Sequence, residues 1–126
     1  MEDMNWIKDN YLTFLQSEEE SRKDTIAKLQ KEERIDEANL EKVKLNIVEI
    51  FSKMFNISYK NTDDPIVLKE KYLSYFDKIT KPWYINKDKA LEFNKETEVI
   101  IEEIKIQEAE SLKKQFINYY DKIDIN

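Results

Sequence analysis

The sequence contains no glycine, no histidine and no cysteine in its 126 residues. Glycine adopts positive φ without steric cost, so its absence disfavours tight β-hairpins and phosphate-binding loops. The absence of histidine and cysteine removes the most common general base, the most common metal ligand and the thiol nucleophile. The residues that remain, rich in Glu, Lys, Ile, Leu and Tyr, favour helices that pack on other helices.

The balance of apolar and charged residues predicts amphipathic helices. Hydrophobic residues make up 40% of the chain and charged residues 38%, which is typical of a narrow buried stripe and a broad solvated face. The aromatic content of 12% disfavours disorder. We therefore expect a single helical domain spanning residues 1–126.

Two helices are predicted in the first half of the chain. Apolar residues at steps of three and four predict one helix over about 3–33, with a polar interval at 16–25. Asp36 is a plausible N-cap for a second helix over about 37–57, which carries the most apolar stripe. That stripe comprises Leu40, Val43, Ile47, Ile50, Phe51 and Met54.

Two further helices are predicted in the second half. The pair Asp64-Pro65 is a strong helix start, and a shorter helix is expected over about 65–80. Pro82 is expected to end it, with an aromatic corner at 81–86. The last helix is expected from about 87 to 122, with a second polar interval around Gln107 and Glu108. No internal repeat is convincing from the sequence, and no low-complexity linker divides the chain.

These stripes predict an all-α fold, namely an antiparallel four-helix bundle with two long outer helices and two shorter inner ones. A three-helix core with a kinked helix is the alternative. The longest apolar run, Val99-Ile100-Ile101, is far too short for a membrane span. The acidic N-terminal residues do not resemble a secretory signal. We expect a cytoplasmic protein with no membrane association.

Carboxylates are the abundant catalytic side chains that remain. Glu98, Glu102 and Glu103 lie close together on the last predicted helix. Bundles that bind two iron ions also need histidines, so an oxygen-ligated Mg²⁺ or Ca²⁺ site is the metal site that remains open. A solvated face with lysine neighbours is the simpler interpretation. We expect no cofactor and no catalytic residues, and a non-enzymatic protein, with a small bundle enzyme or metal-binding protein as the alternative.

Aromatic residues predict an interaction surface at Tyr75, Trp83, Tyr84 and Tyr120, because rigid aromatic side chains anchor interfaces. The corner containing Trp83 is also open to a second interpretation, in which it closes one end of the bundle. Several apolar residues lie off the main stripes. They are either scattered singly or merged into one patch, and a merged patch, which we favour, predicts a two-fold homodimer. The residues off the stripes are Leu15, Tyr75, Ile106, Ile117 and Tyr120.

The net charge of −6 disfavours a nucleic-acid partner, and so does the choice of basic residues. Arg22 and Arg34 are the arginines, whereas recognition of phosphates and base edges favours arginine over lysine. An acidic mimic of nucleic acid is the weakest alternative, because lysines interrupt the acidic residues. The sequence therefore favours a non-enzymatic protein-interaction or regulatory module, with a protein partner or a second copy as its ligand.

Overall fold

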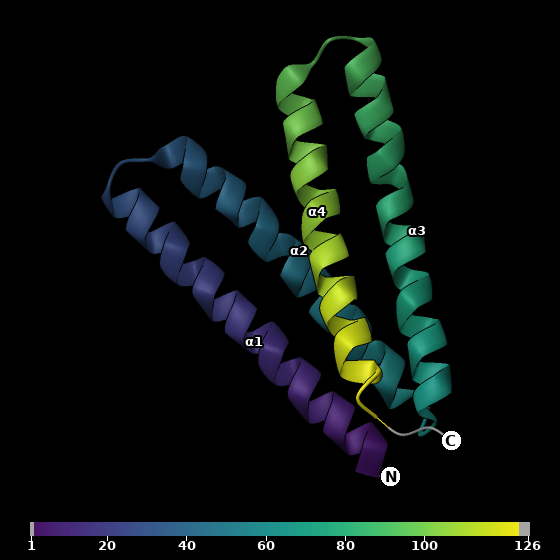
Figure 1. Cartoon of the computed structure of the whole chain (residues 1–126). Coiled ribbons are helices and arrows are strands. Elements are labelled where there is room, and N and C mark those ends of the chain that lie inside the picture. Colours follow the sequence, from purple (N-terminus) through teal and green to yellow (C-terminus); the bar gives the residue numbers. More distant parts are fainter. Residues whose placement is uncertain (1, 124–126) are drawn as a thin grey trace.

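The computed structural model describes residues 2–123, which form four helices and no strand. They are α1 (Glu2–Lys31), α2 (Ile35–Lys60), α3 (Pro65–Glu92) and α4 (Glu96–Tyr120). The helices form two antiparallel hairpins, α1–α2 and α3–α4, which meet at a common foot and part as the two arms of a V (Figure 1). The predicted all-α class is confirmed, and the helix contacts are those of a four-helix bundle.

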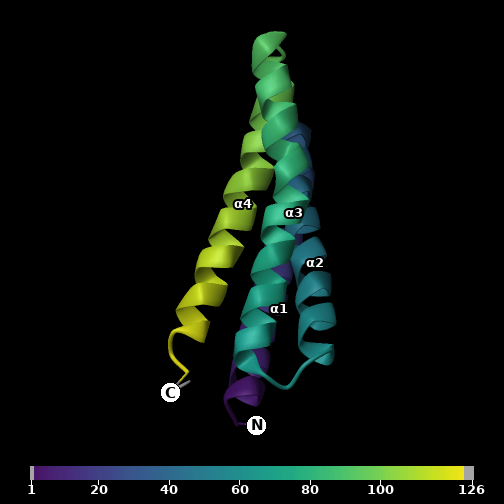
Figure 2. The same ribbon diagram turned by 90° about the vertical axis from the view of Figure 1, so that its right-hand side faces the viewer.

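The foot holds the start of α1, the end of α2, the start of α3 and the end of α4. Seen from the side, the two arms overlap above it (Figure 2). The most extensive contact between the hairpins is between α2 and α4. The helices are also of similar length, 30, 26, 28 and 25 residues, so the expected contrast between long terminal and short central helices is absent.

The main core lies in the foot, where all four helices contribute side chains. Tyr11 of α1 and Tyr72 of α3 are fully buried at its centre, with their hydroxyl oxygens 2.7 Å apart. Burial raises the pKa of both phenols above the ordinary value. Around this pair lie the largest fully buried apolar side chains, namely Ile7, Leu15, Ile47, Phe51, Phe55, Leu68, Leu112 and Phe116.

Both hairpin turns are made without glycine. Glu33 has a φ of 62° and Asn94 a φ of 56°, and each occupies the left-handed position that usually holds glycine at a helix end. The closing backbone bonds are those of a Schellman motif: Arg34 N–H to the Leu29 carbonyl, 2.9 Å, and Lys95 N–H to the Ala90 carbonyl, 2.8 Å.

Helix α3 begins as predicted and ends later than predicted. The Asp64 carboxylate accepts a hydrogen bond from the Ile66 N–H at 2.9 Å, with Pro65 in the first turn. The prediction that Pro82 ends this helix is wrong, because α3 continues to Glu92. Pro82 lies on the exposed face, so it removes one backbone donor without obstructing the packing of α3 on its neighbours. The predicted aromatic corner is therefore helical.

Candidate protein-interaction surface

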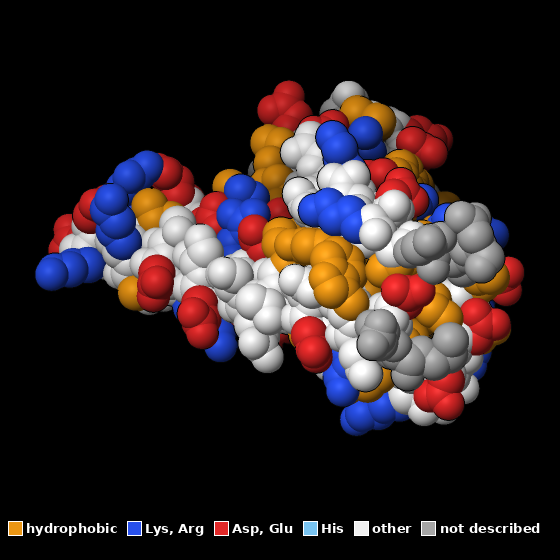
Figure 3. All heavy atoms as spheres, turned by 60° about the horizontal axis from the view of Figure 1, so that its bottom comes forward, with side chains coloured by type: hydrophobic (Ala, Val, Ile, Leu, Met, Phe, Trp, Pro, Cys, Tyr) orange, Lys and Arg blue, Asp and Glu red, His pale blue; other side chains and the backbone are white. Residues whose placement is uncertain are grey.

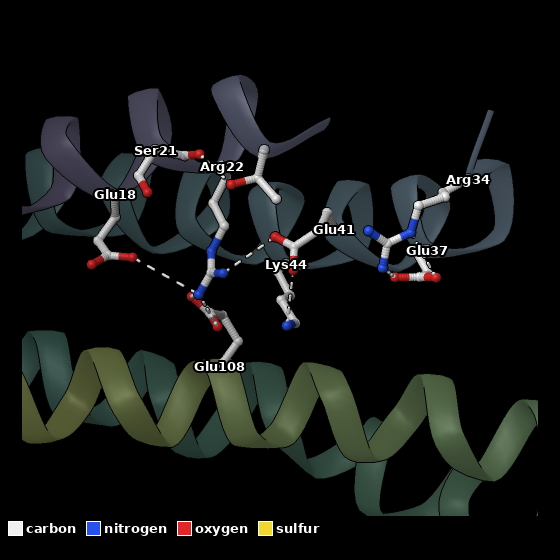
Figure 4. A network of polar contacts seen from close by, with 9 residues as sticks. Glu18, Ser21, Arg22, Arg34, Glu37, Glu41, Lys44 and Glu108 are labelled. Carbon is white, nitrogen blue, oxygen red and sulfur yellow. Dashed lines mark hydrogen bonds and ion pairs between the residues drawn. The ribbon is translucent and has the colours of Figure 1, made fainter. Parts of the chain in front are cut away.

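The two polar intervals of the sequence meet where the arms part. Arg22 of α1 lies between Glu108 of α4 and Glu41 of α2, at 3.0 and 3.2 Å (Figure 4). Burial lowers the pKa of Arg22, but the two carboxylates outweigh it and raise the pKa overall. Burial raises the pKa of Glu108, and Arg22 offsets part of that rise. Arg22 therefore joins three helices, and the polar intervals contact each other within the chain.

The carboxylates proposed as metal ligands do not converge. Each is paired with a lysine instead, as follows: Glu98 with Lys95 at 3.9 Å, Glu102 with Lys105 at 3.1 Å, and Glu103 with Lys87 at 3.7 Å. Within residues 2–123, no three acidic side chains are placed to share an ion. Glu98 and Glu103 form exposed ion pairs on the helix surface, whereas the pair made by Glu102 is largely buried.

The structure does not bring the four predicted surface aromatics together. Tyr84 is exposed (44%), whereas Tyr75 and Trp83 are half-buried. Trp83 packs against the core, with its ring 6.5 Å from that of Phe51. Tyr120 is buried against Phe116 in the foot, so it does not belong to an exposed surface.

The expected patch of residues off the main stripes is also absent, since Leu15, Ile106 and Tyr120 are buried within the chain. Helix α4 packs against both α2 and α3. It therefore buries a wider face than one stripe, which accounts for its additional apolar residues.

Large exposed apolar side chains gather instead along the α3–α4 arm. At its end, Leu91 is 53% exposed, Phe93 67% and Ile100 49%. We name these three residues the α3–α4 tip. Tyr84 and Ile85 continue the exposed apolar surface along α3, at 44% and 45% exposure. The sequence pattern did not reveal this surface, because the helix predicted over about 87–122 places Phe93 inside a helix and not beside a turn.

Shallow hollows lie on the α3–α4 tip. One, of about 420 Å³, is lined by Leu91, Val99 and Ile100 and bordered by Lys95 and Glu96. A second, of about 510 Å³, is lined by Phe93 together with Asn86, Lys89, Ile101 and Glu102. The tip therefore offers apolar recesses with charged groups of both signs at their edges.

The α1–α2 arm provides an internal comparison. Because the two turns have the same geometry around Glu33 and Asn94, residues 61 positions apart occupy equivalent places in the two arms. The exposed apolar residues of the second arm all have polar or charged counterparts in the first. The pairs are Tyr84 with Lys23, Ile85 with Asp24, Leu91 with Gln30, Phe93 with Glu32, and Ile100 with Asn39.

Charged side chains accordingly dominate the α1–α2 arm, at the left of Figure 3. Ile35 is the large apolar residue exposed at its end, at 53%. An arm of this architecture therefore forms without a cluster of exposed apolar residues at its end.

The described helices include none that is long and apolar enough to cross a membrane. Comparison with protein-family models, curated proteins and solved structures finds no match to this chain.

Proposed function

We propose that this chain is a non-enzymatic protein-interaction module of the cytoplasm and that the α3–α4 tip is its docking surface. One observation carries the proposal: Leu91, Phe93 and Ile100 are about half exposed or more, whereas the equivalent positions of the other arm all hold polar or charged residues. Clusters of exposed apolar residues on otherwise charged proteins are typical of interaction sites.

The chemistry of the tip specifies the kind of partner. Its recesses accept aliphatic or aromatic side chains, and Phe93 supplies a large rigid anchor. Lys95 and Glu96 at the edge orient a partner without favouring one sign of charge. The surface therefore fits an apolar protein face with a mixed-charge rim.

The test replaces the tip with its own counterpart. In the triple variant Leu91→Gln/Phe93→Glu/Ile100→Asn, each residue becomes the one at the equivalent position of the α1–α2 arm. The helix content and the free energy of unfolding are expected to stay near wild type. Affinity capture from the native cytoplasm, quantified by mass spectrometry, is expected to lose its specific partner with this variant.

The matched control is Gln30→Ala/Glu32→Ala/Asn39→Ala on the other arm, which is expected to retain the partner. Identical captured proteins for the wild type and the triple variant would contradict the proposed surface. Sedimentation equilibrium identifies self-association: a wild-type dimer that becomes a monomer in the triple variant means that the partner is a second copy.

A further inference from the structure

The buried tyrosine pair joins equivalent positions of the two hairpins. Tyr72 follows Tyr11 by 61 residues, and their hydroxyl oxygens lie 2.7 Å apart. Each hydroxyl also lies near a backbone carbonyl of the opposite hairpin. Tyr11 is 3.3 Å from the Leu112 oxygen and Tyr72 is 3.2 Å from the Phe51 oxygen. Leu112 in turn follows Phe51 by 61 residues. The contact of Tyr11 with Leu112 is therefore equivalent to the contact of Tyr72 with Phe51.

The aromatic rings around the tyrosine pair show the same equivalence between the two hairpins. Tyr11 lies 5.3 Å from the ring of Phe116, and Tyr72 lies 5.2 Å from that of Phe55. Within the hairpins, Tyr11 to Phe55 is 4.9 Å and Tyr72 to Phe116 is 4.8 Å. Phe55 and Phe116 are themselves equivalent and adjoin each other at 6.1 Å. These pairs mark a two-fold axis through the foot.

Polar contacts away from the axis also occur twice. The Lys8 ammonium lies over the Tyr59 ring at 4.9 Å, and the Lys69 ammonium over the Tyr120 ring at 4.7 Å. Glu41 pairs with Lys44 at 3.0 Å, and Glu102 with Lys105 at 3.1 Å. In each of these two pairs of contacts the distances are similar, so the equivalence of the hairpins extends from helix packing to individual side-chain contacts.

The sequence carries the same repeat once the spacing of 61 is known. Residues 8–15 read KDNYLTFL and residues 69–76 read KEKYLSYF. In the second helix of each hairpin the identical pairs are Glu37 and Glu98, Glu41 and Glu102, Lys44 and Lys105, Glu49 and Glu110, Lys53 and Lys114, Phe55 and Phe116, and Tyr59 and Tyr120.

One departure from the repeat explains an otherwise isolated group. Glu41 accepts hydrogen bonds from both Lys44 and Arg22. Its counterpart Glu102 is bonded to Lys105, and its second carboxylate oxygen is buried without a partner. The position equivalent to Arg22 holds Trp83. The oxygen of Glu102 therefore lacks a partner because Trp83 stands at the position where the first hairpin has Arg22.

We propose that the chain is a fused pair of copies of one helical hairpin, and that the hairpins meet through the interface of a two-fold dimer. A two-fold interface is self-complementary. Each hairpin is therefore complementary to a second hairpin of the same kind. A second copy of the chain can provide that hairpin if the two chains exchange hairpins, as in domain swapping. In the chain as it stands, the connection Asn61–Asp64 lets α3 return beside α2, so the interface closes within one molecule.

The experiment shortens that connection in the full chain by deleting Asn61, Thr62 and Asp63, which leaves the Asp64 cap in place. Neighbouring helix axes lie about 8–10 Å apart, and one residue cannot span that distance and reverse the chain. Sedimentation equilibrium is expected to give twice the wild-type mass, with the wild-type helix content per residue. The matched control replaces the same three residues with Ser-Gly-Ser and is expected to keep the wild-type mass.

Two results would overturn the proposal. The first is a shortened chain that is helical and has the wild-type mass. The second is a shortened chain whose helix content stays low as its concentration rises about a hundred-fold, since exchange between copies is favoured by mass action.

Discussion

Glu33 is the residue at which the lack of glycine is expected to cost stability. Its φ of 62° places a side chain with a Cβ in the left-handed region, which is disfavoured by about 1–2 kcal/mol. Asn94 occupies the same place in the second hairpin, and asparagine tolerates this region better. The two turns therefore have the same backbone and different intrinsic stability.

We expect Glu33→Gly to raise the free energy of unfolding by about 1 kcal/mol, because glycine adopts this φ without strain. Urea denaturation measures the change. Lys31→Gly, two residues earlier and still within α1, is the control and is expected to lower stability by about 1 kcal/mol. If both variants are destabilised alike, the conformation of Glu33 is not strained.

At the scale of the element, the helices were predictable from apolar spacing, and the start of α3 from Asp64-Pro65. The end of α3 was not. Pro82 and the aromatic residues after it look like a corner locally, but Trp83 packs against the core and Ala90 is buried further along. Tertiary packing thus outweighs one missing backbone hydrogen bond. The turn that ends α3 lies at Asn94, and this asparagine is the one sequence feature that weakly indicates it.

The same error concealed the exposed surface and the repeat. With the third helix ending near residue 80, Leu91 and Phe93 were placed inside a helix rather than beside a turn. The predicted helices then ran from long to short in the first half and from short to long in the second, so the two halves did not look like copies of one hairpin. The identical residues that reveal the repeat are separated by variable ones, such as Ile47 against Glu108, and the spacing is visible only once the two tyrosines are seen in contact.

We expect Pro82→Ala to raise the free energy of unfolding by about 1–3 kcal/mol, because alanine restores a helix donor and removes the clash with the preceding turn. The equivalent residue of α1 is Ser21. Ser21→Pro is expected to lower stability by about 3 kcal/mol, and thermal unfolding followed by circular dichroism measures both. A loss of stability in Pro82→Ala would mean that α3 depends on the proline.

In the molecule as a whole, the ion pair between Arg22 and Glu108 joins the two arms above the foot. Arg22 is the cation there, and the side chain of Glu108 is 9% exposed. A buried carboxylate is costly when its partner is removed. The equivalent positions on the other side hold Trp83 and Ile47, and Trp83 packs against the core cluster that includes Ile47.

We therefore expect Arg22→Trp alone to lower the free energy of unfolding by about 2–3 kcal/mol, because it leaves Glu108 without its cation. The double variant Arg22→Trp/Glu108→Ile is expected to recover most of that loss. Chemical denaturation of the wild type, both single variants and the double variant gives the coupling energy. Additive effects of the two changes would show that the pair does not act as a unit.

The order of the hairpins along the chain also sets a schedule for synthesis. Domains generally fold as units during synthesis, the N-terminal ones first. The α1–α2 hairpin ends at Lys60. Its core side chains Tyr11 and Phe55 are then expected to remain exposed to solvent until α3 and α4 have been synthesised. Ribosomes that follow one another on a message hold identical unfinished surfaces side by side. If hairpins exchange between chains as proposed, we expect slower translation of the second half to favour closure on a neighbouring chain over closure within one chain.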